Sequence, residues 1–298
     1  MTNKRGVRQA GLSELYGINR RNVELVHAFN RRDLRRWADD KLLAKDALLA
    51  RGVAVPRTLA RCRGLYEVEP VVTELLELSS FVVKPARGSR GRGILVIREL
   101  AEGGWLLAGG SYSSASDLGR HLADIVFGAY SGERPDVALI EECVHPHPFL
   151  FELWPGGLCD VRVLVLEGRA LMAMARVPTE RSRGRANLHQ GGIGIAVDLE
   201  TGVLERAVLD GCFIDTHPET GTALVGRALP NWGALLATAE SAAQAVPLGY
   251  LGVDLTLDRE GNPLVIELNA RPGLEIQNVV GLALGHVLPA HEAFGGRR

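Results

Sequence analysis

Apolar residues along this chain recur in two patterns, the spacing of a helix face and the short continuous run of a buried strand. Helical spacing predicts a helix from Lys41 to Gly52, a second from the expected N-cap Ser116 to about Tyr130, and an alanine-rich third from about Asn231. Short apolar runs predict strands at 53–58, 81–84, 94–97, 137–144, 161–167, 170–177 and 193–199. Turn signals separate many of these strands, so the pattern predicts an α+β fold built mainly from antiparallel pairs.

The clearest pair is a hairpin near the C-terminal end, where turn formers at 258–263 separate two apolar runs. Pairing Leu257 with Leu264 makes one face of the hairpin wholly apolar and places Asp254 opposite Glu267 on the other face. A slip of one residue would move Glu267 onto the apolar face, so the pattern favours this register. Directly opposed carboxylates, with Cβ atoms about 5 Å apart, repel each other. The pattern therefore predicts a positive charge between them.

Composition restricts the class of protein. The 298 residues are 46% hydrophobic with a net charge of −1, enough apolar material for a large core or for two to three smaller ones. The chain contains no apolar run of 18 residues, so neither a membrane span nor a signal peptide is indicated. Its four cysteines lack CxxC spacing, which favours a reduced cytoplasmic protein over a zinc protein.

Charge changes the picture in two places. Only four of the 34 basic residues are lysine, so a lysine in a chemically suggestive place is informative, because arginine does not reproduce its compact ammonium. Residues 1–65 hold fifteen Lys and Arg against six Asp and Glu. This excess could mark a nucleic-acid or membrane-surface footprint, but the charges are scattered without aromatic platforms. A solvated or substrate-facing surface is therefore favoured, and nucleic acid is disfavoured.

Lys84 stands at the end of an apolar strand, before the glycine-rich stretch Gly88-Ser-Arg-Gly91-Arg-Gly93. A second strand follows, whereas a Rossmann turn or a P-loop needs a helix there. Glycines let backbone N–H groups close around phosphate oxygens, and a lysine adds a point charge. The alternative is an ordinary hairpin turn that happens to contain a lysine.

Three further groups of polar residues could carry chemistry. Asp254, Glu267 and Asn269 offer hard oxygen ligands of the kind that Mg²⁺ shares with phosphates, although an exposed polar hairpin face would look the same. "LIEECVHPHP" ends a buried strand in extended backbone that can bond an adenine edge, or is simply an edge strand running into a loop. Arg162, Arg176 and Asn187 suit a carboxylate that is being phosphorylated.

The order of these motifs resembles the ATP-grasp superfamily, and is most similar to its glutamate-ligase branch, which includes the ribosomal-protein glutamate ligase and alpha-L-glutamate ligase-like proteins. The resemblance runs from about Gly17 to Asn278 and rests on "DDKLLAKDALLARGVAVPRT", "VVKPARGSRGRGI", "LIEECV", "DVRVLVL", "RANLHQGG", "GVDLTLD" and "VIELNARPGLE". It implies two α+β subdomains that grip ATP, residues 41–140 with the glycine-rich lid and residues 141–298 with the metal site. Residues 1–40 would form a short N-terminal segment where glutamate ligases of this group have a full α/β unit.

The resemblance also implies roles for individual residues. Lys41 and Lys84 would contact ATP phosphates, Gly88, Ser89, Gly91 and Gly93 would form the lid, and Glu141, Glu142, Cys143 and Val144 would hold adenine. His147 and Glu152 are candidates for the ribose. Asp254, Glu267 and Asn269 would bind two Mg²⁺ ions, for which Mn²⁺ can substitute, and this metal would supply the predicted positive charge. Arg162, Arg176 and Asn187 would face an acyl phosphate.

The implied activity is an ATP-dependent ligase that joins a carboxylate to an amine, with glutamate or another amino acid as one substrate and a small molecule or peptide as the other. Two alternatives stay open. One is an ATP-grasp kinase that stops at phosphorylation, and the other is a non-catalytic nucleotide-binding module. The sequence does not indicate the oligomeric state.

Overall fold

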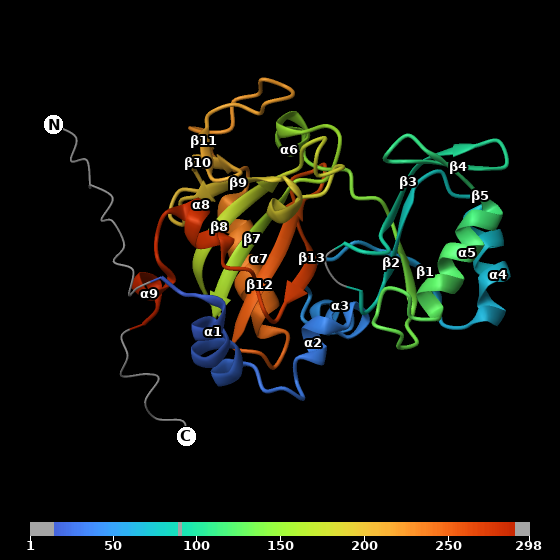
Figure 1. The fold of residues 1–298 in the computed structure, drawn as a ribbon, viewed down its shortest axis with the longest axis horizontal. Coiled ribbons are helices and arrows are strands. Elements are labelled where there is room, and N and C mark those ends of the chain that lie inside the picture. Colours follow the sequence, from blue (N-terminus) through green and yellow to red (C-terminus); the bar gives the residue numbers. More distant parts are fainter. Residues whose placement is uncertain (1–14, 89–90, 290–298) are drawn as a thin grey trace.

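The computed structural model describes residues 15–88 and 91–289, and these form two β-sheets, each packed with helices (Figure 1). The smaller sheet has the order β1-β6-β2-β3-β4-β5, and all its neighbours are antiparallel. Its strands are β1 Thr58–Cys62, β2 Phe81–Pro85, β3 Leu95–Ala101, β4 Gly104–Leu107, β5 Tyr112–Ser114 and β6 Ala138–Glu141. Helices α4 (Val68–Leu75) and α5 (Ala115–Val126) cover the face turned away from the larger sheet and close one apolar core over it (Figure 1).

The larger sheet has the order β11-β10-β9-β8-β7-β12-β13, again antiparallel throughout. Its strands are β7 Asp160–Leu166, β8 Arg169–Val177, β9 Ile193–Val197, β10 Leu204–Leu209, β11 Cys212–Ile214, β12 Tyr250–Leu257 and β13 Pro263–Asn269. Helix α7 (Trp232–Gln244) packs on one face, and α8 (Glu275–Val280) packs on the other. Every residue of β12 is buried, because both faces of this central strand are covered.

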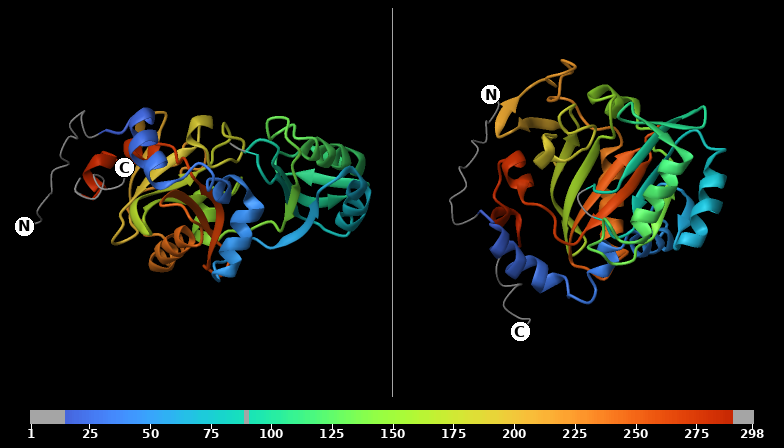
Figure 2. Two further views of the ribbon diagram at one scale, coloured as in Figure 1. Left: turned by 90° about the horizontal axis from the view of Figure 1, so that it is seen from below. Right: turned by 45° about the vertical axis from the view of Figure 1, so that its right-hand side comes forward.

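The N-terminal segment belongs to the larger body. It contains α1 (Ile18–Arg21), the π-helical turn η1 (Asn22–His27) and α2 (Arg36–Asp39), and α3 (Lys41–Ala50) follows it. These helices run past one end of the strands of the larger sheet (Figure 2), and α2 and α3 contact the edge strand β13. Asn30, fully buried, donates from Nδ2 to the carbonyls of Tyr250 (2.7 Å) and Ala270 (2.9 Å), and its Oδ1 accepts from the Tyr250 N–H (3.0 Å). These bonds satisfy buried backbone groups, so the segment is held by specific pairing.

The hairpin register is confirmed around the acidic pair and wrong beyond it. Asp254 lies opposite Glu267, but the register shifts by one residue after that pair, so Leu257 faces Pro263 instead of Leu264. Ile266 is the extra residue of this β-bulge. A bulge locally re-aims side chains, and here both Ile266 and Glu267 line the same cleft.

Several element boundaries differ from the prediction for local reasons. The strand predicted at 53–58 begins only at Thr58, after Pro56, which has no N–H for a ladder. The N-cap of α5 is Ser114, not Ser116, because Ser114 forms a reciprocal capping box with Asp117. The sequence did not predict the short strands β10 and β11, nor helix α6 (Pro148–Leu153), which begins with a proline at its first turn.

The α+β class and its antiparallel pairing are confirmed, whereas the proposed subdomain boundaries at residues 40 and 140 stay predictions. Within the described residues, no helix is long and apolar enough to cross a membrane.

Candidate active site

A cleft of about 2370 Å³ is lined by residues of both sheets. The smaller sheet contributes the end of β2 and part of β3, and the larger sheet contributes β7, β8, β12 and β13. The N-terminal helices line the cleft as well. Most of the described residues that the sequence singled out line this one cavity, and the exceptions are Gly93, His147 and Glu152.

Two lysines share one buried carboxylate at the smaller-sheet end. The Lys84 Nζ lies 2.5 Å from one oxygen of Glu141, and the Lys45 Nζ lies 2.5 Å from the other. All three side chains are less than a tenth exposed. Burial lowers the pKa of Lys45, and the charge of Glu141 opposes that shift. The sequence prediction did not include Lys45.

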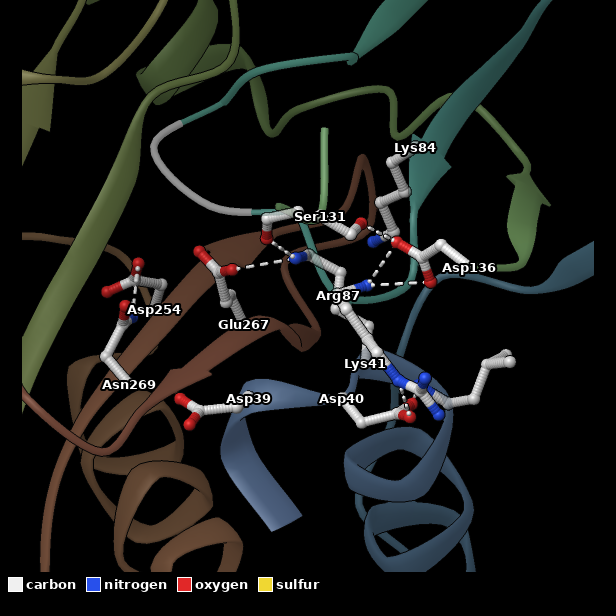
Figure 3. A network of polar contacts seen from close by, with 12 residues as sticks. Asp39, Asp40, Lys41, Lys84, Arg87, Ser131, Asp136, Asp254, Glu267 and Asn269 are labelled. Carbon is white, nitrogen blue, oxygen red and sulfur yellow. Dashed lines mark hydrogen bonds and ion pairs between the residues drawn. The ribbon is translucent and has the colours of Figure 1, made fainter. Parts of the chain in front are cut away.

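Lys41 connects the glycine-rich loop to the acidic hairpin (Figure 3). Its Nζ donates to the Gly88 carbonyl at 2.8 Å and lies 3.2 Å from Glu267 Oε1. An ammonium has three donors, so one remains for a ligand in the cleft. Lys41 starts helix α3 directly after the N-cap Asp40, which fixes where its side chain leaves the backbone.

The start of the glycine-rich loop is anchored by acidic side chains. The Arg87 N–H donates to both oxygens of Asp136 at 3.2 and 3.0 Å, and its Nε donates to Asp40 at 3.0 Å (Figure 3). Gly91 and Gly93 follow with φ of +70° and +73°, a conformation that favours glycine. Ser89 lies outside the described residues, so its predicted phosphate contact stays a prediction.

The residues of the predicted adenine hinge have different contacts from one another. The Glu141 side chain pairs with the two lysines, and Glu142 accepts from the Arg57 N–H at 2.8 Å. The backbone at Cys143 and Val144 lines the cleft and stays the candidate for the base.

Neither ribose candidate gains support. His147 caps helix α6, since its Nδ1 accepts from the Phe149 N–H at 3.1 Å. Glu152 is exposed and pairs with Arg227 at 2.8 Å.

Asp254 belongs to a compact buried cluster of four charged side chains. Arg162 donates to it with both ends of its fork, Nε to Oδ1 at 2.7 Å and Nη2 to Oδ2 at 2.6 Å. Arg176 reaches the same Oδ2 at 2.8 Å and also holds Asp160 with two bonds of 2.5 and 2.7 Å. Register explains the arrangement, because Arg162 lies opposite Asp254, and Asp160 lies opposite Arg176.

The positive charge predicted beside the acidic pair is therefore present in the protein itself, as arginine at Asp254 and as Lys41 at Glu267. Burial raises the pKa of Asp160 to about 6, Arg176 opposes that shift, and Asp254 adds to it. Asp254 is also buried, yet Arg162 and Arg176 outweigh burial and hold its pKa below the ordinary value. The sequence prediction did not include Asp160.

The predicted metal ligands fit Mg²⁺ unequally. Within residues 15–88 and 91–289, no three His, Cys, Asp or Glu side chains gather closely enough to hold a metal. Glu267 and Asn269 line the cleft, and Mg²⁺ commonly completes its shell with phosphate oxygens and water. Asp254 Oδ2 already accepts from two arginines and from Asn269 Nδ2 at 3.2 Å, so Asp254 fits only if an arginine moves.

Asn187 lies on a loop that also lines the cleft. Its Oδ1 accepts from the His189 N–H at 3.1 Å and caps the 3₁₀ turn η3 (Leu188–Gln190). The amide group is thus held in place at the cleft wall, and its predicted role toward an acyl phosphate stays a prediction.

Comparison with known proteins gives a match over most of the chain. The sequence model of the family described as sugar-transfer associated ATP-grasp matches residues 20–292. A probable alpha-L-glutamate ligase of Marinobacter nauticus is 29% identical over 246 residues, covering 81% of this chain and 59% of that protein. A protein of the same name from Psychromonas ingrahamii is 27% identical over 239 residues, covering 79% of this chain and 56% of that protein.

Among solved structures, D-cycloserine synthetase DcsG superposes with a TM-score of 0.47 at 18% identity, covering 86% of this chain and 70% of that one. Because this TM-score is low, the fold is assigned from the match to the sequence family alone. The chain spans less than three fifths of the length of the two curated relatives above.

Proposed function

This chain belongs to the sugar-transfer associated ATP-grasp family, and on that premise we propose that it is an ATP-dependent ligase joining a carboxylate to an amine. One observation carries the proposal. A single cleft holds two lysines suited to nucleotide phosphates, Lys41 and Lys84, together with the buried cluster of Arg162, Arg176 and Asp254. Phosphoryl transfer to a carboxylate needs both kinds of group close to each other.

In this proposal ATP lies with its base against the backbone at Cys143 and Val144 and its phosphates beneath the glycine-rich loop. Lys84 and Lys41 come from two different elements that line the cleft, β2 and α3. Their charges offset the negative charge that the β- and γ-phosphates develop. Glu267 and Asn269 would hold the Mg²⁺ that neutralises the phosphates and aligns the γ-phosphate.

The reaction has two balanced steps. A substrate carboxylate oxygen bonds to the γ-phosphorus as the bridging β,γ P–O bond breaks, giving an acyl phosphate and ADP. The amine nitrogen then bonds to the acyl carbon, the C–O bond to phosphate breaks, and the amine proton passes to the departing phosphate or to water. Arg162, Arg176 and Asn187 would orient the carboxylate and donate to the oxyanion of the second step.

Glutamate as one substrate is the narrower part of the proposal, and its support is the name of the two curated relatives. We assign the reaction to the cytoplasm because all four cysteines are free. Two Mg²⁺ ions, with Mn²⁺ as a substitute, complete the proposal.

The test is ADP release by the full chain with Mg²⁺ and ATP, across a panel of amino acids, other carboxylates and amines, followed by mass measurement of products. We expect release that depends on both a carboxylate and an amine, with a product lighter by one water than the sum of the two substrates. Lys84→Ala and Glu267→Gln should abolish release. Glu260→Gln, an exposed acid in the turn of the same hairpin, is the matched control and should retain it.

Two outcomes would contradict the ligase. A stable phosphorylated product formed one-to-one with ADP, without any need for an amine, would identify a kinase. ATP binding without ADP release under any pair of substrates would identify a non-catalytic module.

A further inference from the structure

The cleft carries far more positive charge than the chain as a whole. Fifteen Lys and Arg residues line it against seven Asp and Glu, whereas the net charge of the chain is −1. The nucleotide offsets little of this excess, because ATP arrives with divalent cations of its own. A cleft with such an excess concentrates anionic ligands.

Part of the excess gathers where the N-terminal helices meet the residues that follow β13. Arg271 pairs with Asp39 of α2, and the Pro272 carbonyl accepts from Arg21. Arg271 lies within roughly 13 Å along the chain of Glu267, which contacts Lys41. Five arginines line the cleft in this region, here called the arginine end: Arg21, Arg32, Arg35, Arg36 and Arg271.

Arg21 shows that this end is built for a ligand. Its side chain is only 7% exposed and lines the cleft, and its Nη1 donates to the Pro272 carbonyl at 2.5 Å. Its Nε is buried with no hydrogen-bond acceptor among the described residues, and the nearby Tyr250 hydroxyl is also buried and unpaired. Buried polar groups are nearly always paired in native proteins. We therefore expect a ligand to supply the hydrogen-bond acceptor that this guanidinium lacks.

Four of these five arginines form no structural ion pair within the described part of the chain. Arg21, Arg32, Arg35 and Arg36 have no carboxylate at salt-bridge distance there. Arg271 pairs with Asp39 at 2.8 Å. Arg35 donates from Nε to the Asn30 carbonyl at 3.1 Å, which orients its guanidinium and leaves the rest of the fork for a ligand.

We infer that the carboxylate substrate carries a second anionic group, a phosphate or a further carboxylate, which this arginine end of the cleft binds. Guanidinium forks bind both groups with paired hydrogen bonds, and this chemistry does not distinguish one from the other. The inference rests on the proposed ligase reaction only in calling the ligand a substrate. The reacting carboxylate would then lie between this end and the phosphate lysines, beside Arg162.

A nucleic acid fits the same charges less well than a small anionic substrate does. Single strands are usually held by exposed aromatic platforms interleaved with cations. In the described N-terminal segment, Tyr16 is buried, and Phe29 and Trp37 are partly buried against the apolar cores. The arginines also line a cleft that is shared with the candidate catalytic groups.

The test measures anion binding by calorimetry on the full chain saturated with a non-hydrolysable ATP analogue and Mg²⁺, so that the nucleotide site is filled. The probes are inorganic pyrophosphate, citrate and acetate. We expect pyrophosphate or citrate to bind and acetate not to bind, and the preferred probe distinguishes a phosphate from a carboxylate. In Arg32→Gln/Arg36→Gln the affinity should fall about tenfold or more, with nucleotide affinity unchanged.

The matched control is Arg31→Gln/Arg51→Gln, which removes the same charge from exposed positions outside the cleft lining and should change anion affinity by no more than about twofold. Arg21→Gln is measured alongside, with circular dichroism to show that it folds. Equal losses in test and control variants would overturn the inference. So would an absence of anion binding, or tighter binding of a single-stranded oligonucleotide than of pyrophosphate that the same variants abolish.

Failure of the ligase and failure of the anion site can be told apart. Anion binding that depends on Arg32 and Arg36, in a protein that never releases ADP, would keep the site and reject the reaction. Efficient ligation of a carboxylate with no second anionic group, unchanged in the Arg32→Gln/Arg36→Gln variant, would keep the reaction and reject the site.

Discussion

Replacing Arg176 by methionine should lower the free energy of unfolding more above pH 6 than below it. Arg176 is the shared partner of two buried carboxylates, Asp160 and Asp254, and with Arg162 the four charges sum to zero. Removing one cation leaves a net negative charge in a buried cluster, and breaking a buried pair in this way costs about 3–5 kcal/mol. For a chain of 298 residues, whose unfolding entropy is about 0.6 kcal/mol/K, that loss lowers the melting temperature by about 5–8 °C.

The pH dependence follows from Asp160. Its pKa of about 6, against an ordinary value of 3.8, makes its ionised form cost about 3 kcal/mol of stability already in the parent protein. A raised carboxyl pKa means that the folded state binds a proton before the unfolded state does, so stability increases as the pH falls from about 7 toward 4. Arg176 is the main group that lowers this pKa. Without it the pKa rises further, and the increase begins at a higher pH.

Urea unfolding of both proteins at pH 5.5 and pH 8 is the assay, with Asp160→Asn/Arg176→Met as the third member of the series. We expect a large loss at pH 8, a smaller one at pH 5.5, and partial recovery in the double variant, because the asparagine removes the stranded charge. An equal loss at both pH values, or no recovery in the double variant, would refute the electrostatic account and leave only lost packing.

Other predictions address the rest of the structure. Lys45→Met should raise the KM for ATP about tenfold, because Lys84 then becomes the only counter-charge of Glu141, and exposed Asp46→Asn is the control in steady-state ADP release. Ser114→Ala removes the cap of α5 and should cost about 1 kcal/mol in urea unfolding, whereas Ser116→Ala should leave stability nearly unchanged. Gly128→Ala should cost about 2–3 kcal/mol, since φ is +86° and a Cβ would lie 2.2 Å from the Arg134 carbonyl oxygen; Gly132→Ala, with φ of +66° and open space around it, isolates the strain alone. Chelation by EDTA should stop ADP release, and either Mg²⁺ or Mn²⁺ should restore it; release that persists in EDTA would contradict the metal proposal.

Local patterns predicted the central elements well. The helix that starts at Lys41, the strand that carries Lys84 and the β12–β13 hairpin all follow from apolar spacing and turn chemistry over fewer than twenty residues. The opposition of Asp254 and Glu267 could be predicted because a strand alternates its faces strictly and only one register keeps a dry face.

The same reasoning failed where the partner is distant in sequence. The bulge at Ile266 has no signal in a window of the hairpin alone, and it displaced every pair beyond it. Lys45 and Asp160 could not be singled out, since their importance comes from Glu141 and Arg176, which lie on other strands.

The sequence by itself determined the fold class, the order of the motifs and most of the chemical groups around the cleft. Each of these follows from short-range patterns of apolar and polar residues. Only the tertiary structure decided which charges neutralise which. It paired Asp254 with arginines where sequence reasoning placed a metal, and it brought Arg21, Arg32, Arg35 and Arg36 into one wall of the cleft. The physical reason is that charges act through space and burial, so their partners are set by how distant strands and helices pack.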